Sequence, residues 1–270
     1  MKTRLFTLVV LFASSLWASC SPKDDLTPVE QLVDSLIGVD LRMHKAEDIS
    51  VLLVDADGRI VADRKGHRSK SSGEYSFKSG KPDDEFCPGQ LLLPVLATAC
   101  IVHCGINSDT MLAIGAKRVD GVDLYDFQNN VTRSGKVVDS LPLYRALQSP
   151  VAITELCQEC FPTIVELRAA TSLYLGTQVR DKDYIKICQG QIMVPRKSMI
   201  NFLLKNRHVL KFNNGDPICF YSVQTNSKRG ETQEGCLMSS SKGACLLVFS
   251  NIYFPGAKEL ANKIVNIQNI

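Results

Sequence analysis

The feature that most constrains the fold is an uncharged, almost wholly apolar stretch from Gln90 to Cys104, which reads QLLLPVLATACIVHC. A helix that is apolar all round belongs in the interior of a protein, because none of its faces suits contact with water. Pro94 is compatible with this helix in the first turn, where its missing N–H would have no partner anyway. A Pro88-Gly89 pair precedes the stretch. The sequence therefore predicts a helix that begins at this turn and is covered by the remaining elements.

Patterns near the N-terminus predict one helix and two strands. Residues 28–37 place apolar side chains on one helix face, with Thr27 as the cap and Glu30 completing a capping box. Residues 49–64 read as two strands joined by an Asp-Gly turn. The polar stretch 67–84 is rich in Ser, Gly and Lys and predicts a loop.

The C-terminal part returns to strands and closes with a helix. Residues 218–225, 232–240 and 244–254 read as strands, and residues 256–268 as an amphipathic helix. Between the two ends, residues 141–207 alternate short helical patterns with turns. This order predicts an α+β fold. An antiparallel sheet of about five strands is packed by the N- and C-terminal helices, with a helical insert between them.

The first residues have the layout of a secretory signal. Lys2 and Arg4 precede an apolar run that ends in the small pair Ala18-Ser19. The apolar run is too short for a standard membrane-spanning helix. We predict a signal peptide over residues 1–19, a tether over residues 20–27 and a single domain over residues 28–270.

Cys20 follows the small pair directly and resembles the lipidated cysteine of bacterial lipoproteins, with Trp17 standing where that pattern has Leu. The next residues, SPKDD, resemble the surface-export tag of lipoproteins in the Bacteroides group. The resemblance implies lipidation at Cys20. It also implies an anchor in the outer membrane, on either its periplasmic or its surface face. The alternative is an ordinary cleaved signal followed by a chance cysteine.

Charge and cysteine usage exclude some functions. The formal net charge is +3 without a long basic run, which argues against nucleic-acid binding. Of the ten cysteines, nine lie after Cys20, mostly in apolar runs where cysteine acts as a small hydrophobic residue. Cys157-x-x-Cys160 is a candidate redox or zinc element, but the chain has no second C-x-x-C to complete four zinc ligands. We predict no metal and no cofactor.

Several segments resemble, in order, the transpeptidase domain of penicillin-binding proteins, the β-lactamase-like serine enzymes that crosslink peptidoglycan. The resemblance spans about residues 49–267. The opening hairpin is VLLVDADGRIVA, and the family's Pro-Gly-Ser-x-x-Lys-Pro segment with its long helix is matched by FCPGQLLLPVLATACIVHCGI. Later segments are LYRALQSPVAITEL, IKICQGQIMVPRKSMINFLLKN and SKRGETQ, the last falling where the family has Lys-Thr-Gly-Thr. The resemblance implies a β-lactamase/transpeptidase-like fold.

The family's catalytic positions are occupied by other residues in this chain. Gln90 stands at the serine of S-x-x-K and Leu93 at its lysine, and neither can form the acyl ester or accept the proton. Gln148 and Pro150 stand at the S-x-N positions. K-[ST]-G survives in part as Lys228-Arg229-Gly230, which keeps a cation and a glycine and is the candidate ligand-binding segment.

Other candidate catalytic groups are weaker. Ser239 and Lys242 match S-x-x-K literally, but they precede Gly243 where a turn between strands is expected, so we interpret them as a hairpin tip. Cys87 lies just before the Pro-Gly turn, without a patterned His or acid to activate it. His103 lies in the apolar helix and is predicted to be a packed core residue.

Three functional hypotheses follow. In the first, the chain keeps the transpeptidase-like fold, lacks acyl transfer and is a lipid-anchored binding or scaffold protein. Its partner would be a peptidoglycan stem peptide or another envelope protein. The second is an active acyl-transfer enzyme or hydrolase with a displaced nucleophile, either Cys87 or a serine. The third is a redox or metal role for Cys157 and Cys160. The replaced positions favour the first.

Overall fold

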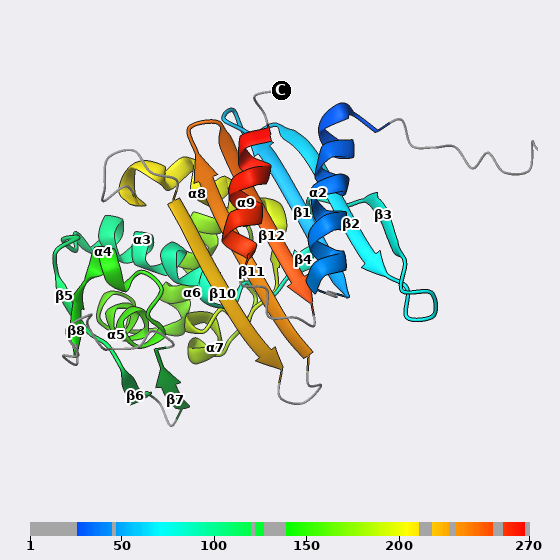
Figure 1. The fold of residues 1–270 in the computed structure, drawn as a ribbon. Helices are drawn as coiled ribbons and strands as arrows, with labels where there is room; N and C mark the ends of the chain where they lie inside the picture. The colour runs from blue at the N-terminus through cyan, green and yellow to red at the C-terminus, as the bar shows by residue number, and fades with distance from the viewer. Residues whose placement is uncertain are drawn as a thin grey trace, which may run out of the picture.

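The computed structural model describes residues 26–44, 47–119, 122–126, 139–210, 218–226, 231–250 and 256–267. Its centre is an antiparallel sheet in the order β10-β11-β12-β1-β2-β3 (Figure 1). The strands are β1 (Asp48–Asp55), β2 (Ile60–Arg68), β3 (Tyr75–Ser79), β10 (Ile218–Asn226), β11 (Glu231–Ser240) and β12 (Gly243–Ser250). β1 pairs with β12 from Asp48 opposite Ser250 to Asp55 opposite Gly243. Strands from the two ends of the chain therefore meet in the middle of the sheet.

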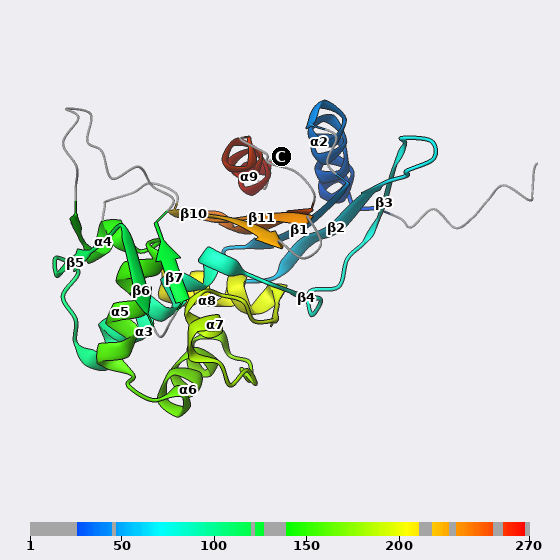
Figure 2. The same cartoon turned by 90° about the horizontal axis from the view of Figure 1, so that it is seen from below.

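Two helices cover one face of the sheet, α2 (Pro28–His44) and α9 (Ala257–Asn266) (Figure 2). Alternate residues of β1, including Ile49 and Val51, pack in this layer with Leu260 and Ile264 of α9. This alternation follows from the two-residue period of a strand, which sends neighbouring side chains to opposite faces. The predicted N- and C-terminal helices are confirmed, and they share one layer.

The capping box of α2 is present as the sequence predicts. The Glu30 N–H donates to Oγ1 of Thr27 at 3.2 Å, and the Thr27 N–H donates to Oε2 of Glu30 at 2.9 Å. Two of the helix's otherwise unpaired N-terminal donors are satisfied in this way. The helix continues to His44, beyond the predicted residues 28–37.

The other face carries the helical insert. Its helices are η1 (Gly89–Leu92), α3 (Leu93–Cys104), α4 (Leu143–Ala146), α5 (Pro150–Cys160), α6 (Ile164–Leu175), α7 (Tyr184–Cys188) and α8 (Arg196–Leu210). Short strand pairs accompany them: β4 (Glu85–Phe86) with β9 (Val194–Pro195), β5 (Met111–Ala113) with β8 (Ser140–Pro142), and β6 (Ala116–Val119) with β7 (Val122–Tyr125). The predicted apolar helix is confirmed, because every residue from Leu91 to Cys100 is buried. It packs in the core between the sheet and the outer helices.

Two sequence predictions about local structure are wrong. The stretch 67–84, predicted as a loop, contains the edge strand β3, so the sheet has six strands where about five were expected. Tyr75 and Phe77 pack against the core of the α2 layer, and the Ser, Gly and Lys residues around them hid this alternation. His103 is exposed, because the last turn of α3 extends beyond the core; its ring lies 5.5 Å from that of Phe161.

Within the described ranges, none of the helices has the length and apolar character needed to cross a membrane.

Candidate functional site

A glycine contact fixes the turn before the apolar helix. Gly89 has a left-handed backbone, with φ of +53°, and its N–H donates to the carbonyl oxygen of Gly190 at 3.1 Å. A Cβ on Gly190 would lie 2.0 Å from the carbonyl oxygen of Gly89. The two backbones can therefore approach this closely only with a glycine at residue 190. The Pro88-Gly89 turn is therefore held against the end of α7.

Cys87 adds two further contacts to this turn. Its Sγ donates to the carbonyl oxygen of Gly190 at 3.2 Å, and its own carbonyl oxygen accepts a hydrogen bond from Nε2 of Gln233 at 2.7 Å. Gln233 belongs to β11, so these bonds join the turn to the sheet. The Cys87 thiol therefore helps to hold the turn in place.

Gln90 and Gln148 converge on the same short piece of the edge strand β10. The Gln90 N–H donates to Oγ of Ser222 at 3.0 Å, and Nε2 of Gln148 donates to the carbonyl oxygen of Tyr221. Two positions that the family resemblance assigns to its serine motifs therefore lie beside neighbouring residues of one strand. Pro150 follows as the first residue of α5, and the Ser149 side chain caps that helix.

The side chains of Gln90 and Gln148 are amides. A glutamine amide is neither a nucleophile nor a proton acceptor at neutral pH. The Gln148 amide bridges the segment before α5 to β10. Leu93 is completely buried, as are Leu91 and Leu92. A Cβ on Gly235 would lie 2.7 Å from Cδ1 of Leu91, so this leucine packs directly onto β11. The start of the helix is filled by apolar packing.

Ser222 and Tyr221 are site residues that the sequence reasoning missed. The pattern ICFYSVQT identified the strand, but nothing in it showed which strand residues meet the helix start. Ser222 is 2% exposed, and its hydroxyl accepts the Gln90 N–H. The alternation of β10 was the available signal, because Phe220 faces the helical insert and Tyr221 the opposite layer.

Other predicted site residues lie elsewhere or outside the described residues. Cys20 and the segment Lys228-Arg229-Gly230 fall outside the described residues, so their roles stay predictions. Ser239 ends β11 and is 2% exposed, and Lys242 lies in the turn to β12. The literal S-x-x-K pair is thus a hairpin tip, without the helical spacing that catalysis would require.

Cys157 and Cys160, both in α5, each contact a cysteine of α3. Sγ of Cys157 lies 3.9 Å from Sγ of Cys100, and Sγ of Cys104 lies 3.6 Å from the carbonyl oxygen of Cys160. Within the part of the chain that the structure describes, no group of three or more His, Cys, Asp or Glu side chains is placed to hold a metal ion. The cysteines form an interface between α3 and α5.

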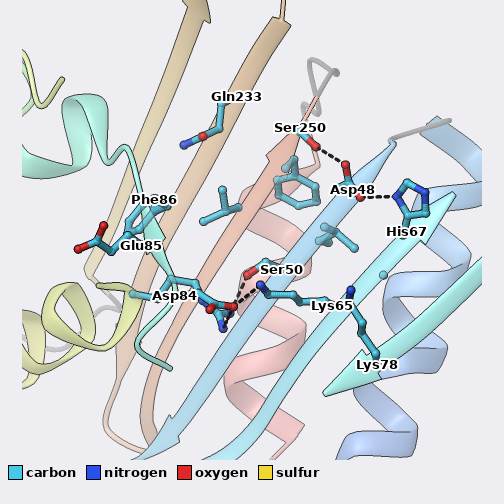
Figure 3. A pocket seen from close by; sticks show the side chains of 15 residues that line it. Asp48, Ser50, Lys65, His67, Lys78, Asp84, Glu85, Phe86, Gln233 and Ser250 are labelled. Atoms are coloured by element: carbon cyan, nitrogen blue, oxygen red, sulfur yellow. Dashed lines mark hydrogen bonds and ion pairs between the residues drawn. The ribbon is translucent and has the colours of Figure 1, made fainter. Parts of the chain in front are cut away.

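A hollow of about 550 Å³ lies beside β4 (Figure 3). Asp48 lies at one end of the hollow. It accepts hydrogen bonds from Nδ1 of His67 at 2.6 Å and from the Ser250 hydroxyl at 3.0 Å. At the other end Lys65 forms an ion pair with Asp84. Each end of the hollow therefore carries one pair of an acidic and a basic side chain.

Arg196 is the most buried charge that lines this hollow, at 2% exposed. Its Nη2 contacts both oxygens of Asp63, at 2.8 and 3.0 Å, and its Nη1 donates to Oγ of Ser50 at 2.6 Å. Burial raises the pKa of the Asp63 carboxyl, and the Arg196 guanidinium opposes that rise. These contacts of Nη1 and Nη2 tie the start of α8 to the middle of the sheet. We assign this cluster to the stability of the fold.

Comparison with solved structures identifies the architecture. A structure described as a peptidoglycan glycosyltransferase from Burkholderia ambifaria matches at a TM-score of 0.65 and 9% identity, over 90% of this chain and 96% of that one. Penicillin-binding protein 3 from Mycobacterium tuberculosis, complexed with aztreonam, matches at 0.66 and 12%, over 90% and 78% of the two chains. Penicillin-binding protein 2B from Streptococcus pneumoniae matches at 0.64 and 12%, over 89% of this chain and 57% of that one.

The sequence alone reveals no relative: no protein-family model and no curated protein matches it. The structural matches cover about nine tenths of the chain. The motif-based resemblance and the structural matches lead to the same fold. The chain has the fold of penicillin-binding-protein transpeptidase domains.

Proposed function

We propose that this protein is a transpeptidase-like domain that lacks acyl-transfer activity and acts as a binding or scaffold lipoprotein of the cell envelope. The observation that carries the proposal is the convergence of Gln90 and Gln148 on Tyr221 and Ser222 of β10. The frame of a nucleophile turn is kept, while amides and a buried leucine occupy the positions where the family has its serines and lysine.

The chemistry of acyl transfer needs three groups together: a nucleophile, a base within hydrogen-bond reach, and donors for the developing oxyanion. Gln90 contributes a backbone N–H that is already bonded to Ser222, and Leu93 contributes only apolar surface. The Ser222 hydroxyl lies beside Gln90, but Ser222 is 2% exposed and its oxygen accepts the hydrogen bond from the Gln90 N–H. The geometry supports a site that holds its parts together and does not react.

A binding role follows from what the fold retains. The edge strand β10 presents backbone groups beside the former nucleophile turn, and the segment Lys228-Arg229-Gly230 supplies cations near its end in sequence. Such an edge pairs with extended peptides by adding a strand. A peptidoglycan stem peptide, or an extended segment of another envelope protein, is the ligand that this surface suits.

Covalent labelling with a fluorescent penicillin tests the loss of catalysis. We expect no labelled band from the folded protein at concentrations that label an active penicillin-binding protein completely. A band that persists after native labelling, and that disappears on changing Cys87 or any single serine to alanine, would establish the displaced-nucleophile enzyme instead. A heat-denatured sample controls for non-specific reaction.

Co-sedimentation with purified peptidoglycan tests the binding role. We expect the protein to pellet with peptidoglycan and the double variant K228A/R229A to bind at least about fivefold more weakly, since each lost cation removes on the order of 1 kcal/mol of attraction. Lys242→Ala, which removes a cation from the tip of the β11–β12 hairpin, is the matched control and should bind normally. Equal binding by all three proteins would refute the assignment of this segment.

Metabolic labelling with a fatty acid tests the anchor. We expect the full chain to incorporate label and Cys20→Ala to lose it, with the variant protein released from the membrane fraction. Release of the wild-type protein in soluble form, without label, would favour an ordinary cleaved signal.

A further inference from the structure

Five cysteines of the helical insert form a line from the surface to the core. Cys104 at the end of α3 is exposed and Cys160 at the end of α5 is half-buried, while the deeper thiols are completely buried: Cys100, Cys157 and Cys188. The motif Cys157-x-x-Cys160 joins two residues that are close in the chain. In the folded molecule the contacts run between helices.

Cysteines of α3 contact cysteine residues of α5 at two points. Sγ of Cys104 lies 3.6 Å from the Cys160 carbonyl oxygen, which places the two residues side by side at the outer end of the α3–α5 contact. Further inward, Sγ of Cys100 lies 3.9 Å from Sγ of Cys157.

We propose that Cys104 and Cys160 are a modification site at which exchange with an external disulfide links α3 to α5. Cys104 is the entry thiol because it is the exposed member of the line. Cys160 is the resolving thiol because it is the half-buried cysteine whose backbone carbonyl oxygen contacts the Cys104 thiol. Burial, followed by its contact with Cys104, raises the pKa of the Cys160 thiol, which also suits the second step better than the first.

The exchange proceeds in two balanced steps. The Cys104 thiolate attacks the external disulfide, whose S–S bond breaks; a mixed disulfide forms on Cys104 and one external thiolate leaves and takes up a proton. Cys160 then loses its proton to solvent and attacks the Cys104 sulfur, which releases the second external thiolate. Two electrons pass from the cysteines to the external disulfide, which ends as two thiols.

The link has a consequence for the candidate site. Gln90 lies in η1, which leads into α3, and Gln148 lies two residues before the start of α5; the two helices end at Cys104 and Cys160. Both helices therefore run from β10 to the pair of thiols, so a bond at Cys104 and Cys160 closes the far end of the same two helices. The disulfide would fix their spacing along their whole length and stiffen the frame around Gln90 and Gln148.

The experiment incubates the full chain with oxidised glutathione, blocks remaining thiols, and maps disulfide-linked peptides by mass spectrometry. We expect a Cys104–Cys160 linked peptide from the wild type. The oxidised protein should melt on the order of 5 °C above the reduced protein, since the bond closes a loop of more than fifty residues. Cys160→Ser should accumulate glutathione on Cys104, because the resolving thiol is missing. Cys104→Ser should react at least about tenfold more slowly.

Both variants replace thiols outside the fully buried core, so they should fold and remain testable. Cys219→Ser is the matched control: Cys219 is a half-buried thiol, 3.7 Å from Sγ of Cys236 on the opposite face of the sheet, and its loss should leave the Cys104–Cys160 peptide unchanged. A stable glutathione adduct on wild-type Cys104, a linked Cys157–Cys160 peptide, or an unchanged rate in Cys104→Ser would each overturn the proposal.

Discussion

At the scale of single residues, the contact whose loss should cost the fold most is the buried pair of Arg196 and Asp63. Arg196→Met removes the guanidinium and leaves the Asp63 carboxylate buried without its partner. Breaking one partner of such a pair typically costs about 3–5 kcal/mol. We expect a loss of this size in the free energy of unfolding, measured by urea denaturation.

The neighbouring residue provides the control. Lys197 forms an ion pair with Asp83 at 2.5 Å, but both side chains are well exposed. Lys197→Met should change the free energy of unfolding by less than about 1 kcal/mol, as is usual for surface pairs. Similar losses in both variants would show that Arg196 acts through its packing or its charge in general, and not through the buried pair.

Asp84 should make the stability of the fold depend on pH in the acidic range. The hydrogen bond from Lys65 lowers the pKa of the Asp84 carboxyl below its ordinary value of 3.8. A carboxyl whose folded pKa is depressed stabilises the fold above its unfolded pKa, and this contribution disappears as the pH falls through the folded value. We therefore expect wild type and Lys65→Met to differ in urea midpoint at pH 7 and to converge below about pH 3. The groups are one third exposed, so added salt should shrink the difference. A difference that persists at low pH would contradict the role of Asp84.

At the scale of elements, the turn before α3 depends on the approach of two glycines. Gly190→Ala would place a methyl group 2.0 Å from the carbonyl oxygen of Gly89, at a residue whose φ is +66°. Gly176 has nearly the same φ, +64°, but nothing lies within 4 Å of a Cβ there. Gly176→Ala should cost only the left-handed backbone strain, about 1–2 kcal/mol. Gly190→Ala should cost a further 1–3 kcal/mol or so from the clash. Equal losses of stability in the two variants, measured by thermal or urea denaturation, would show that the backbones of Gly89 and Gly190 can move apart.

Helix α3 tests whether the family's lysine can simply be restored. Leu93 is completely buried, so Leu93→Lys places an ammonium group in an apolar core and should cost more than about 3 kcal/mol. Val102, on the last turn of the same helix, is 55% exposed, and Val102→Lys should stay within about 0.5 kcal/mol. A Leu93→Lys variant with wild-type stability would mean that this position still opens into a groove.

The elements show what a sequence pattern can reveal. The apolar run 90–104, the capping box at Thr27 and the hairpin of β1 and β2 are local signals, and the structure confirms each. Strand β3 lacks such a signal, because only two apolar residues, Tyr75 and Phe77, distinguish it from the loops beside it. His103 was misplaced for the opposite reason: an apolar run indicates burial, but not the residue at which the helix leaves the core.

At the scale of the whole molecule, the sheet is assembled from both ends of the chain, and the site is assembled from its middle and its end. The α+β layout was predictable because each strand and terminal helix has its own periodicity. The contact of Gln90 with Ser222 joins residues 132 positions apart and leaves no mark in local pattern. The aligned family motifs indicated Gln90 and Gln148, but the strand residues that they meet required the three-dimensional pairing of β10.

The C-terminal helix α9 should be indispensable for a stable fold, because it covers strands in the middle of the sheet. It buries several large apolar side chains against β11 and β12, among them Leu260, Ile264 and Val265. Each such side chain contributes about 1.5–3 kcal/mol, so their sum approaches the whole stability of a typical domain, about 5–15 kcal/mol. A chain that ends at residue 255 should therefore fail to unfold cooperatively and should bind a hydrophobic dye. A chain that begins at residue 26 keeps every described contact and should retain the wild-type melting temperature. A stable, cooperative truncation at residue 255 would show that the sheet needs cover on one face only.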